Sequence, residues 1–240
     1  MEPEIDPGPC RRCGTCCEKG GPALHRDDRP LVDQGHIPAG CLFTIRKGER
    51  VIDNVNGVPE FLAEEILKIK GQNGLWCCFF YDRPSRGCRI YDHRPVECRA
   101  LNCRDTRRIE AIYRTARLTR RDLLGGISGL WELIADHEQR CGYQVLQALV
   151  GEGLDPSRLK QEKEILEIVR FDAHIRELTV ERAGLDGRLL EFIFGRPLID
   201  TIKTFGIQLV KTKGVYGLTA ARPPYGKQHA GLSGNARGEN

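Results

Sequence analysis

The spacing of apolar residues changes near residue 105. Before that point, β-branched and aromatic residues form short runs between turn residues, which is typical of short strands. After it, apolar residues recur at three- and four-residue steps, which is typical of helices with one buried face. The pattern therefore predicts an α+β protein, with short hairpins in the first part and helices in the second.

Two hairpins are predicted in the first part. Residues 42–55 place β-branched residues on both sides of a turn at Lys47-Gly48, and residues 67–82 form a similar pattern around the turn 71–74. Residues 59–67 are also compatible with a helix. The rest of this part is predicted to be loop, a form that lets ligands converge on an ion.

The strongest helix signal follows Asp155-Pro156, where Asp155 is suited to cap a helix and Pro156 to occupy its first position. The apolar residues that then recur predict a buried stripe, formed by Ile165, Ile168, Phe171, Ile175 and Leu178. After Gly206 the chain is rich in glycine and poor in large apolar side chains, so it is predicted to stay flexible.

Three parts are therefore expected. Residues 1–105 form an irregular, cysteine-rich, metal-binding domain, residues 106–206 form a helical region, and residues 207–240 form a flexible basic tail.

Eleven cysteines in 240 residues need a chemical explanation. A chain of this length can bury a core without cross-links, and an odd number of cysteines cannot pair off completely. The N-terminus MEPEIDPGPC lacks a basic segment followed by an apolar one, and no stretch is apolar enough to span a membrane, so we expect a cytoplasmic protein without a membrane partner. Because disulfides are rare in the cytosol, metal binding or catalysis is the leading explanation.

The charge distribution argues against nucleic acid as a partner. The net charge of +4 arises entirely in the last 35 residues, since residues 1–205 contain as many acidic as basic side chains. A nucleic-acid-binding domain usually carries its basic surface on the fold itself. One basic run keeps this alternative open, and it consists of Arg104, Arg107, Arg108, Arg114, Arg117, Arg120 and Arg121.

The cysteines themselves form a constellation at the start of the chain. The run CRRCGTCC holds Cys10, Cys13, Cys16 and Cys17, and two-residue gaps of this kind let thiolates turn toward one centre, as in bacterial ferredoxins. Gly14 permits the tight backbone path. Since Cys16 and Cys17 are adjacent, they are expected to point in different directions, toward a second centre or another vertex.

Zinc is the alternative occupant of such a cluster. A structural zinc site with four thiolates normally takes two CxxC-type segments. Here the later cysteines are separated by nine, nine and four residues, and they are Cys78, Cys88, Cys98 and Cys103. This irregular spacing favours an iron-sulfur cluster, although thiolate ligands alone do not separate it from zinc. Cys41, Cys77 and Cys141 are expected to be packing residues.

The combination of CRRCGTCC with WCCFFYD and GCRIYDHRPVECRAL resembles the CxxCxxCC zinc- or iron-chelating domain family, also called the YkgJ-type cysteine-cluster family. The resemblance assigns metal-ligand roles to Cys10, Cys13, Cys16, Cys17, Cys78, Cys88 and Cys98. Cys78 is preferred to Cys77 because Phe80-Tyr81 follows it at the family's offset. Cys103 lies beyond the family pattern and would bring the number of ligands to eight, enough for two four-thiolate sites.

The residues around the later cysteines suggest supporting roles. Arg94 and Arg99 are placed to neutralise a thiolate-rich centre, and Pro95 is placed to start the helix that carries Cys98. His93 is a further candidate ligand, but a single loop histidine is more often solvated.

Three functions agree with these features. The first is an iron-sulfur protein with a redox, electron-transfer or assembly role and a protein partner of unknown identity. The second is a cluster-dependent group-transfer enzyme, since the resemblance extends to flagellin lysine-N-methylase, which uses S-adenosylmethionine. The third is a zinc-stabilised interaction protein. No catalytic residues can be singled out, because the sequence shows no nucleotide-binding loop and no nucleophile-base pattern.

Overall fold

The computed structural model describes residues 10, 12–150, 162–212 and 215–221. The helices are α1 (Thr15–Glu18), α2 (Arg29–Asp33), α3 (Val96–Ala100), α4 (Arg107–Ile112), α5 (Arg120–Leu124), α6 (Leu130–Cys141), α7 (Tyr143–Val150), α8 (Glu162–Ala183), α9 (Leu190–Phe194) and α10 (Leu198–Thr201). The strands are β1 (Leu42–Ile45), β2 (Arg50–Ile52), β3 (Pro59–Phe61), β4 (Ile66–Ile69), β5 (Tyr81–Asp82), β6 (Gly87–Cys88), β7 (Ile207–Thr212) and β8 (Val215–Ala220). The α+β class and the mainly helical second part are confirmed. Asp155-Pro156 lies outside the described residues.

The strands pair differently from the prediction for residues 42–55. Strand β1 pairs with β4, with Leu42 opposite Ile69, while β2 pairs with β3. The predicted hairpin between β1 and β2 is wrong because the segment between them is not an exposed turn. Arg46 and Glu49 are buried there, and the Gly48 N–H donates to the Leu62 carbonyl at 2.8 Å.

Residues 67–82 do not form a single hairpin either, because their strands pair with different partners. The predicted turn after β4 forms, since the Gln72 N–H donates to the Cys77 carbonyl at 2.8 Å. Beyond it, β5 pairs with β6 and not with β4, so that Tyr81 lies opposite Cys88. The helix considered for residues 59–67 is absent from this described segment, which contains β3 and the start of β4.

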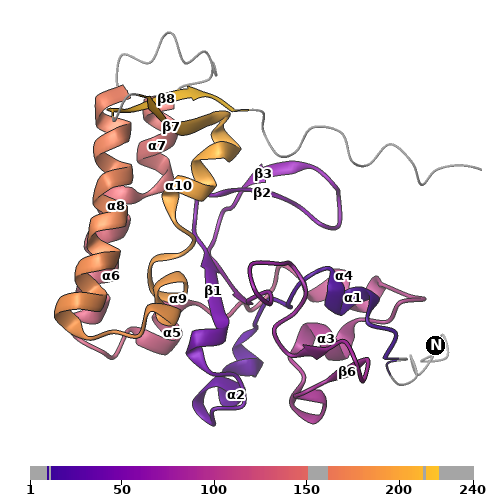
Figure 1. Cartoon of the computed structure of the whole chain (residues 1–240). Coiled ribbons are helices and arrows are strands. Elements are labelled where there is room, and N and C mark those ends of the chain that lie inside the picture. The colour runs from indigo at the N-terminus through magenta and orange to yellow at the C-terminus, as the bar shows by residue number, and fades with distance from the viewer. Residues whose placement is uncertain (1–9, 11, 151–161, 213–214, 222–240) are drawn as a thin grey trace, which may run out of the picture.

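Two apolar clusters form the main core. The first joins strands β1 and β4 to helices α6 and α9, and it includes Leu42, Leu67, Ile134 and Phe194. The second lies between α7, α8 and α10. Figure 1 shows α6 and α8 on one side of the molecule, the cysteine-rich segments around α1 and α3 on the other, and β1 between them. The first cluster thus takes residues from both sides of residue 105, and the division of the chain there stays a prediction.

A set of buried ion pairs connects these elements. The Glu138 carboxylate on α6 accepts hydrogen bonds from Arg46 Nη1 at 3.3 Å and from Arg120 Nη2 at 2.8 Å. Both arginine side chains are almost completely buried. Arg120 also binds Glu65, just before β4, and donates to the Ile193 carbonyl in α9. Glu138 and Arg120 together therefore link the end of β1 to α5, α6, α9 and the start of β4.

A second buried network corrects the predicted stripe on α8. Asp172 is buried in the middle of that helix, where its Oδ1 contacts His137 Nε2 at 2.8 Å and accepts from Arg176 Nε at 3.0 Å. The buried face consists of Ile165, Leu166, Val169, Asp172, Arg176 and Thr179. Of the predicted stripe, only Ile165 is fully buried, and Ile168, Phe171, Ile175 and Leu178 are half-buried. Charged residues can be buried when they pair with opposite charges. The spacing of apolar residues does not predict such pairs.

The tail prediction needs a correction over its first residues. Residues 207–240 were expected to be flexible, yet β7 and β8 form an antiparallel hairpin from Ile207 to Ala220. Leu209 and Leu218 pack against the second cluster, and the Leu218 N–H donates to Glu162 Oε1 on α8 at 2.8 Å. The long helix supplies the apolar surface that the segment lacks by itself. Residues 222–240 lie outside the described part of the chain.

Replacing Glu138 tests the first network. Glu138→Ala leaves the buried Arg46 and Arg120 without a shared counter-charge, so we expect it to lower the free energy of unfolding by about 3 kcal/mol. Asp136→Ala, on the same helix, removes an exposed pair with Arg140 and should cost less than about 0.5 kcal/mol. Urea unfolding of both variants measures the difference, and equal losses would contradict this role for Glu138.

The second network predicts a pH dependence. Burial raises the pKa of Asp172, but hydrogen bonds from His137, Arg176 and the Leu198 N–H prevail and lower it from 3.8 to about 2. The carboxylate therefore stabilises the native state above pH 4, and this contribution is lost as the pH falls toward 2. The stability difference between wild type and Asp172→Asn should shrink by about 2 kcal/mol over that range. A difference that stays constant in pH-dependent urea titrations would refute the assignment.

Candidate metal centre

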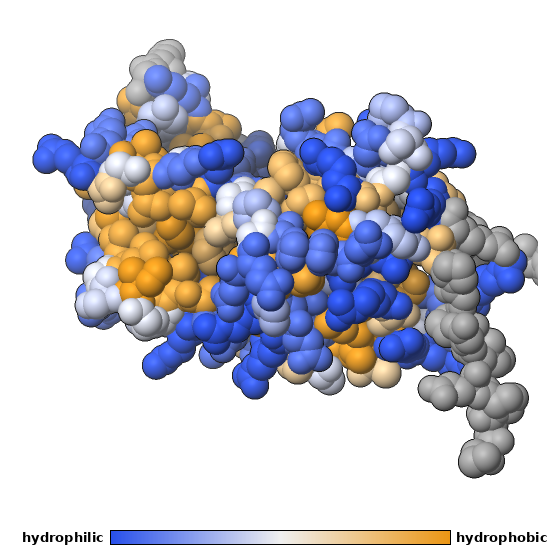
Figure 2. Space-filling view, turned by 90° about the horizontal axis from the view of Figure 1, so that it is seen from below, coloured by the Kyte–Doolittle hydropathy of each residue, from blue (hydrophilic) through white to orange (hydrophobic). Residues whose placement is uncertain are grey.

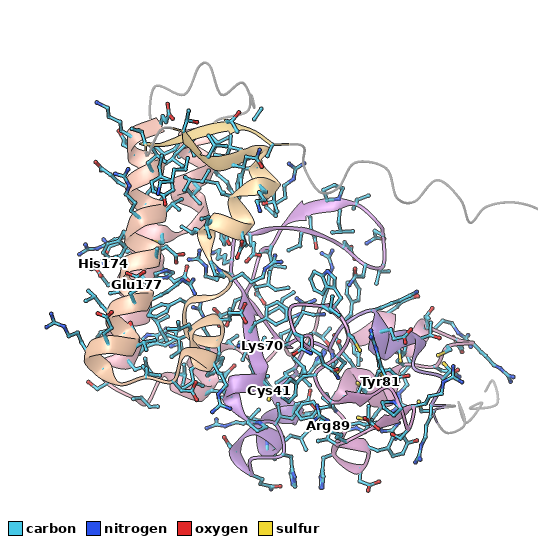
Figure 3. All side chains as sticks on the ribbon, viewed as in Figure 1. Cys41, Lys70, Tyr81, Arg89, His174 and Glu177 are labelled. Atoms are coloured by element: carbon cyan, nitrogen blue, oxygen red, sulfur yellow. The ribbon has the colours of Figure 1, made fainter. Side chains whose placement is uncertain are left out.

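The eight cysteines predicted as ligands come from separate segments and lie in one region. They are placed before and in α1 (Cys10, Cys13, Cys16, Cys17), before β5 (Cys78), in β6 (Cys88), in α3 (Cys98) and before α4 (Cys103). All are free thiols. Figure 3 shows sulfur atoms gathered around Tyr81 at this end of the molecule. Each of the eight is close enough to another for their charges to interact.

Gly14 shapes the first segment. Its φ angle of 83° lies in the left-handed region, and it directly precedes α1. A Cβ atom at this position would lie 2.0 Å from the Tyr81 hydroxyl oxygen. The ring of Tyr81 therefore packs directly on the Gly14 backbone, and glycine is required both for the backbone angle and for the close approach.

Backbone hydrogen bonds join the first segment to the second. The Cys78 N–H donates to the Cys17 carbonyl at 2.7 Å. The Cys78 carbonyl in turn accepts from Gln72 Nε2 at 2.9 Å, inside the turn that follows β4. The β5–β6 pair then places Cys88 opposite Tyr81. These contacts hold Cys17, Cys78 and Cys88 on one connected piece of backbone.

The helix that carries Cys98 is anchored at its first turn. Pro95 is its N-terminal flanking residue, in agreement with the predicted helix start. The Val96 N–H donates to Asp28 Oδ1 at 2.8 Å, and Glu97 Oε2 accepts from the Ala23 N–H at 2.7 Å. These two contacts fix α3, and with it Cys98, against the segment that follows α1.

The adjacent thiols of α1 have opposite pKa shifts. Their sulfur atoms lie 3.9 Å apart. A hydrogen bond from Cys17 stabilises the Cys16 thiolate and lowers the pKa of Cys16 to about 6. The same contact, together with burial and the neighbouring thiols of Cys78 and Cys98, raises the pKa of Cys17. The contact therefore favours a thiolate at Cys16 beside a neutral thiol at Cys17.

The later thiols are held mostly in their neutral form. Burial raises the pKa of Cys78 to about 11, and burial with the charges of Cys78, Cys16 and Cys88 raises the pKa of Cys98. Burial, followed by the charges of Cys16, Cys13 and Cys10, raises the pKa of Cys103. Several thiolates side by side repel one another, so a cation is needed for all of them to ionise together.

Arginines lie next to the cluster. The guanidinium of Arg94 sits 3.8 Å from the centroid of the Tyr91 ring, Arg12 sits 4.2 Å from it, and Arg94 opposes the rise in the pKa of Cys88 that burial causes. Arg99 donates to the Arg94 carbonyl at 3.0 Å.

Seen from below, hydrophilic residues cover much of the right-hand side of the molecule, and apolar residues gather more on the left (Figure 2).

The remaining cysteines are buried in the apolar clusters, as expected for packing residues. Cys41 and Cys77 belong to the first cluster, and Cys141 belongs to the second. The charge of Cys78 acts on Cys17 and Cys98. The ring of His93 stacks on that of His36, with centroids 3.5 Å apart.

The structure also brings together a group of potential metal ligands that the sequence does not predict. Ligand atoms of His137, Cys141 and Asp172 lie within 4.8 Å of one another, and all three residues are buried. The four-residue step from His137 to Cys141 on one helix is the signal that could have found the pair. Both Asp172 oxygens already accept hydrogen bonds, and the charge of Arg176 beside them repels a cation. This group therefore fits a structural ion-pair network better than a metal site.

The cysteine cluster, in contrast, fits a metal. Thiolates are the ligands that structural zinc and iron-sulfur clusters take in proteins. The eight free thiols are brought together from distant segments, with raised pKa values among them that metal binding would reverse.

Comparison with known families agrees with this chemistry. Residues 9–115 match the CxxCxxCC family model, described as a putative zinc- or iron-chelating domain. No curated protein and no solved structure matches the chain. The matched range contains all eight candidate ligands, so the chain carries a cysteine-rich, metal-chelating domain.

No helix among the described residues combines the length and the apolar character that crossing a bilayer requires.

Gly14 offers a test of how the site is shaped. Gly14→Ala adds backbone strain of about 1–2 kcal/mol and a collision with Tyr81, so we expect metal content per chain to fall well below that of wild type. Gly35→Ala is the matched control, because Gly35 has a similar φ of 77° but no heavy atom within 4 Å of the added Cβ. Elemental analysis compares the two, and equal metal content would show that the Tyr81 contact does not matter.

Proposed function

We propose that the cysteine-rich part binds iron-sulfur, as one or two 4Fe-4S clusters, through Cys10, Cys13, Cys16, Cys17, Cys78, Cys88, Cys98 and Cys103. The observation that carries the proposal is the gathering of these eight thiols from separate segments into one region. The protein would then serve a redox, electron-transfer or assembly role in the cytoplasm.

The sulfur atoms are not arranged as a preformed four-thiolate zinc site. Four thiolates around one zinc ion stand about 3.8 Å apart, since each Zn–S bond is about 2.3 Å long. Within the described part of the chain, no three of the eight sulfurs lie within 4.8 Å of one another. A cuboidal cluster accepts wider separations because its thiolates bind different iron atoms.

The surroundings of the cluster suit electron transfer. A bound iron-sulfur cluster supplies one-electron chemistry. Phe80 and Tyr81, next to Cys78 in the chain, are buried, whereas Cys13 and Cys103 are exposed. A redox partner can therefore approach the exposed cysteines, while the protein interior limits solvent access to the rest.

The group-transfer alternative receives less support. An enzyme needs a substrate pocket that adjoins its cofactor. A cleft of about 500 Å³ is present, but its lining contains Arg120, Trp131 and Glu138 and none of the cysteines. We therefore do not place a catalytic role in this cleft.

Nucleic acid binding is also less favoured, because several arginines of the basic run are bound within the protein. Arg120 is buried on Glu65 and Glu138, Arg114 pairs with Asp53 and Glu60, and Arg107 pairs with Asp105. These carboxylates neutralise much of the charge that a phosphate backbone would require.

Anaerobic purification tests the proposal. We expect a brown protein that absorbs at about 400 nm and contains iron and acid-labile sulfide, since sulfide-to-iron charge transfer is visible and zinc has no such transition. Cys16→Ser should lose most of the colour, whereas Cys41→Ser, the control for a packing cysteine, should keep it. A colourless protein that contains zinc and no sulfide, after expression with adequate iron, would overturn the proposal.

A further inference from the structure

The eight thiols differ in exposure. Cys10, Cys13 and Cys103 are exposed, whereas Cys78 is buried and Cys17, Cys88 and Cys98 are partly buried. Cys16, partly buried as well, stands between the two groups. A single centre with four ligands can use only half of these sulfurs, so the gradient raises the question of which thiols act together.

Charge interactions among the thiols group them into two adjoining sets. The charge of Cys103 interacts with those of Cys10, Cys13 and Cys16. On the buried side, Cys98 interacts with Cys78 and Cys88, and Cys17 interacts with Cys78 and Cys98. Three contacts cross between the sets, so the sets adjoin each other: Cys16 with Cys17, whose sulfur atoms lie 3.9 Å apart, Cys10 with Cys88, and Cys16 with Cys98.

The backbone separates the thiols in the same way. Cys17, Cys78 and Cys88 are joined by the hydrogen bond from Cys78 to Cys17 and by the β5–β6 pair, and Cys98 lies on the anchored helix α3. Cys13 precedes α1, and Cys103 follows α3 in a short turn closed by Asn102 and Asp105. The buried set is therefore built on paired backbone, and the exposed set on the loops around it.

The sequence spacing agrees with this division. Cys10, Cys13 and Cys16 form a C-x2-C-x2-C run, which in ferredoxins supplies three ligands to one cluster, while a fourth cysteine comes from elsewhere in the chain. Cys103 is placed to be that fourth ligand. Cys17, one residue after Cys16, is hydrogen-bonded through its carbonyl to the segment of Cys78 and belongs to the other set.

We propose that the eight cysteines form two adjoining four-thiolate sites of unequal stability: an outer site of Cys10, Cys13, Cys16 and Cys103, and an inner site of Cys17, Cys78, Cys88 and Cys98. This inference rests on the metal binding proposed above, but it holds for either metal. The outer site loses its metal to chelators or oxidants first, because solvent reaches its ligands. The inner site stabilises the fold of the cysteine-rich part, because its ligands join three segments of that part.

Two double variants of the full chain test the division. Cys13→Ser with Cys103→Ser removes two outer ligands, and we expect it to keep half of the wild-type metal and an unchanged far-UV circular dichroism spectrum. Cys78→Ser with Cys98→Ser removes two inner ligands, and we expect loss of the metal and faster proteolysis of residues 10–103. Cys41→Ser with Cys141→Ser is the control that changes two cysteines of neither set.

Native mass spectrometry under anaerobic conditions counts the metal centres, and the kinetics of metal release to a chelator show whether they differ in stability. Wild type should carry two centres and release them in two phases, and the outer double variant should lack the fast phase. A wild type with one centre, release in a single phase, or an outer variant without metal would each overturn the division while leaving metal binding intact. Wild-type protein without any metal would instead overturn the proposed function, and the division with it.

Discussion

The carboxylate of Glu138 is the contact on which the arrangement of the two halves depends. It bonds the buried guanidinium groups of Arg46, just after β1, and of Arg120, at the start of α5. Burying these charges is unfavourable unless they are paired, so the elements that carry them must stay together. Glu65 and the Ile193 carbonyl complete the bonding of Arg120 and bring the start of β4 and α9 into the same arrangement.

Strand β4 transmits this arrangement to the cysteine cluster. Its Ile69 N–H donates to the Pro22 carbonyl at 3.1 Å, and the Leu24 N–H donates to the Leu67 carbonyl at 2.9 Å. Residues 22–24 lie three residues beyond the end of α1, and the Ala23 N–H donates to Glu97 on the helix of Cys98. Through these bonds the helical half of the protein sets the position of the backbone around both the first and the last group of thiols.

The cluster itself has the opposite electrostatic character from that network. In the network every buried charge has an opposite partner, whereas burial and neighbouring thiols raise the pKa values of Cys17, Cys98 and Cys103. Folding by itself therefore works against ionisation of the thiols, and a bound metal reverses the balance. The buried ion pairs stabilise the arrangement of the helices and strands. A bound metal would stabilise the thiolates of the cysteine cluster, which this arrangement alone disfavours.

The tail and the long helix show what an apolar pattern can miss. Strands β7 and β8 have few large apolar side chains, yet they pair, with Leu209 and Leu218 packed against the second core cluster, to which α8 contributes. Apolar spacing predicts a stripe on α8, but the buried face of that helix contains Asp172 and Arg176. These charges are tolerated in the interior because Asp172 pairs with both Arg176 and His137. Neither the surface nor the partners can be identified from local sequence.

By itself the sequence determined the α+β class, the helical second part, the packing role of Cys41, Cys77 and Cys141, and the metal-chelating character of the first part, because these depend on residue type and local spacing. Only the tertiary structure decided that β1 pairs with β4, that Tyr81 closes over Gly14, and which thiols of the eight are neighbours. These features join residues far apart along the chain, and they depend on how buried charges find partners. The spacing of residues within one segment does not predict which distant residues will pair.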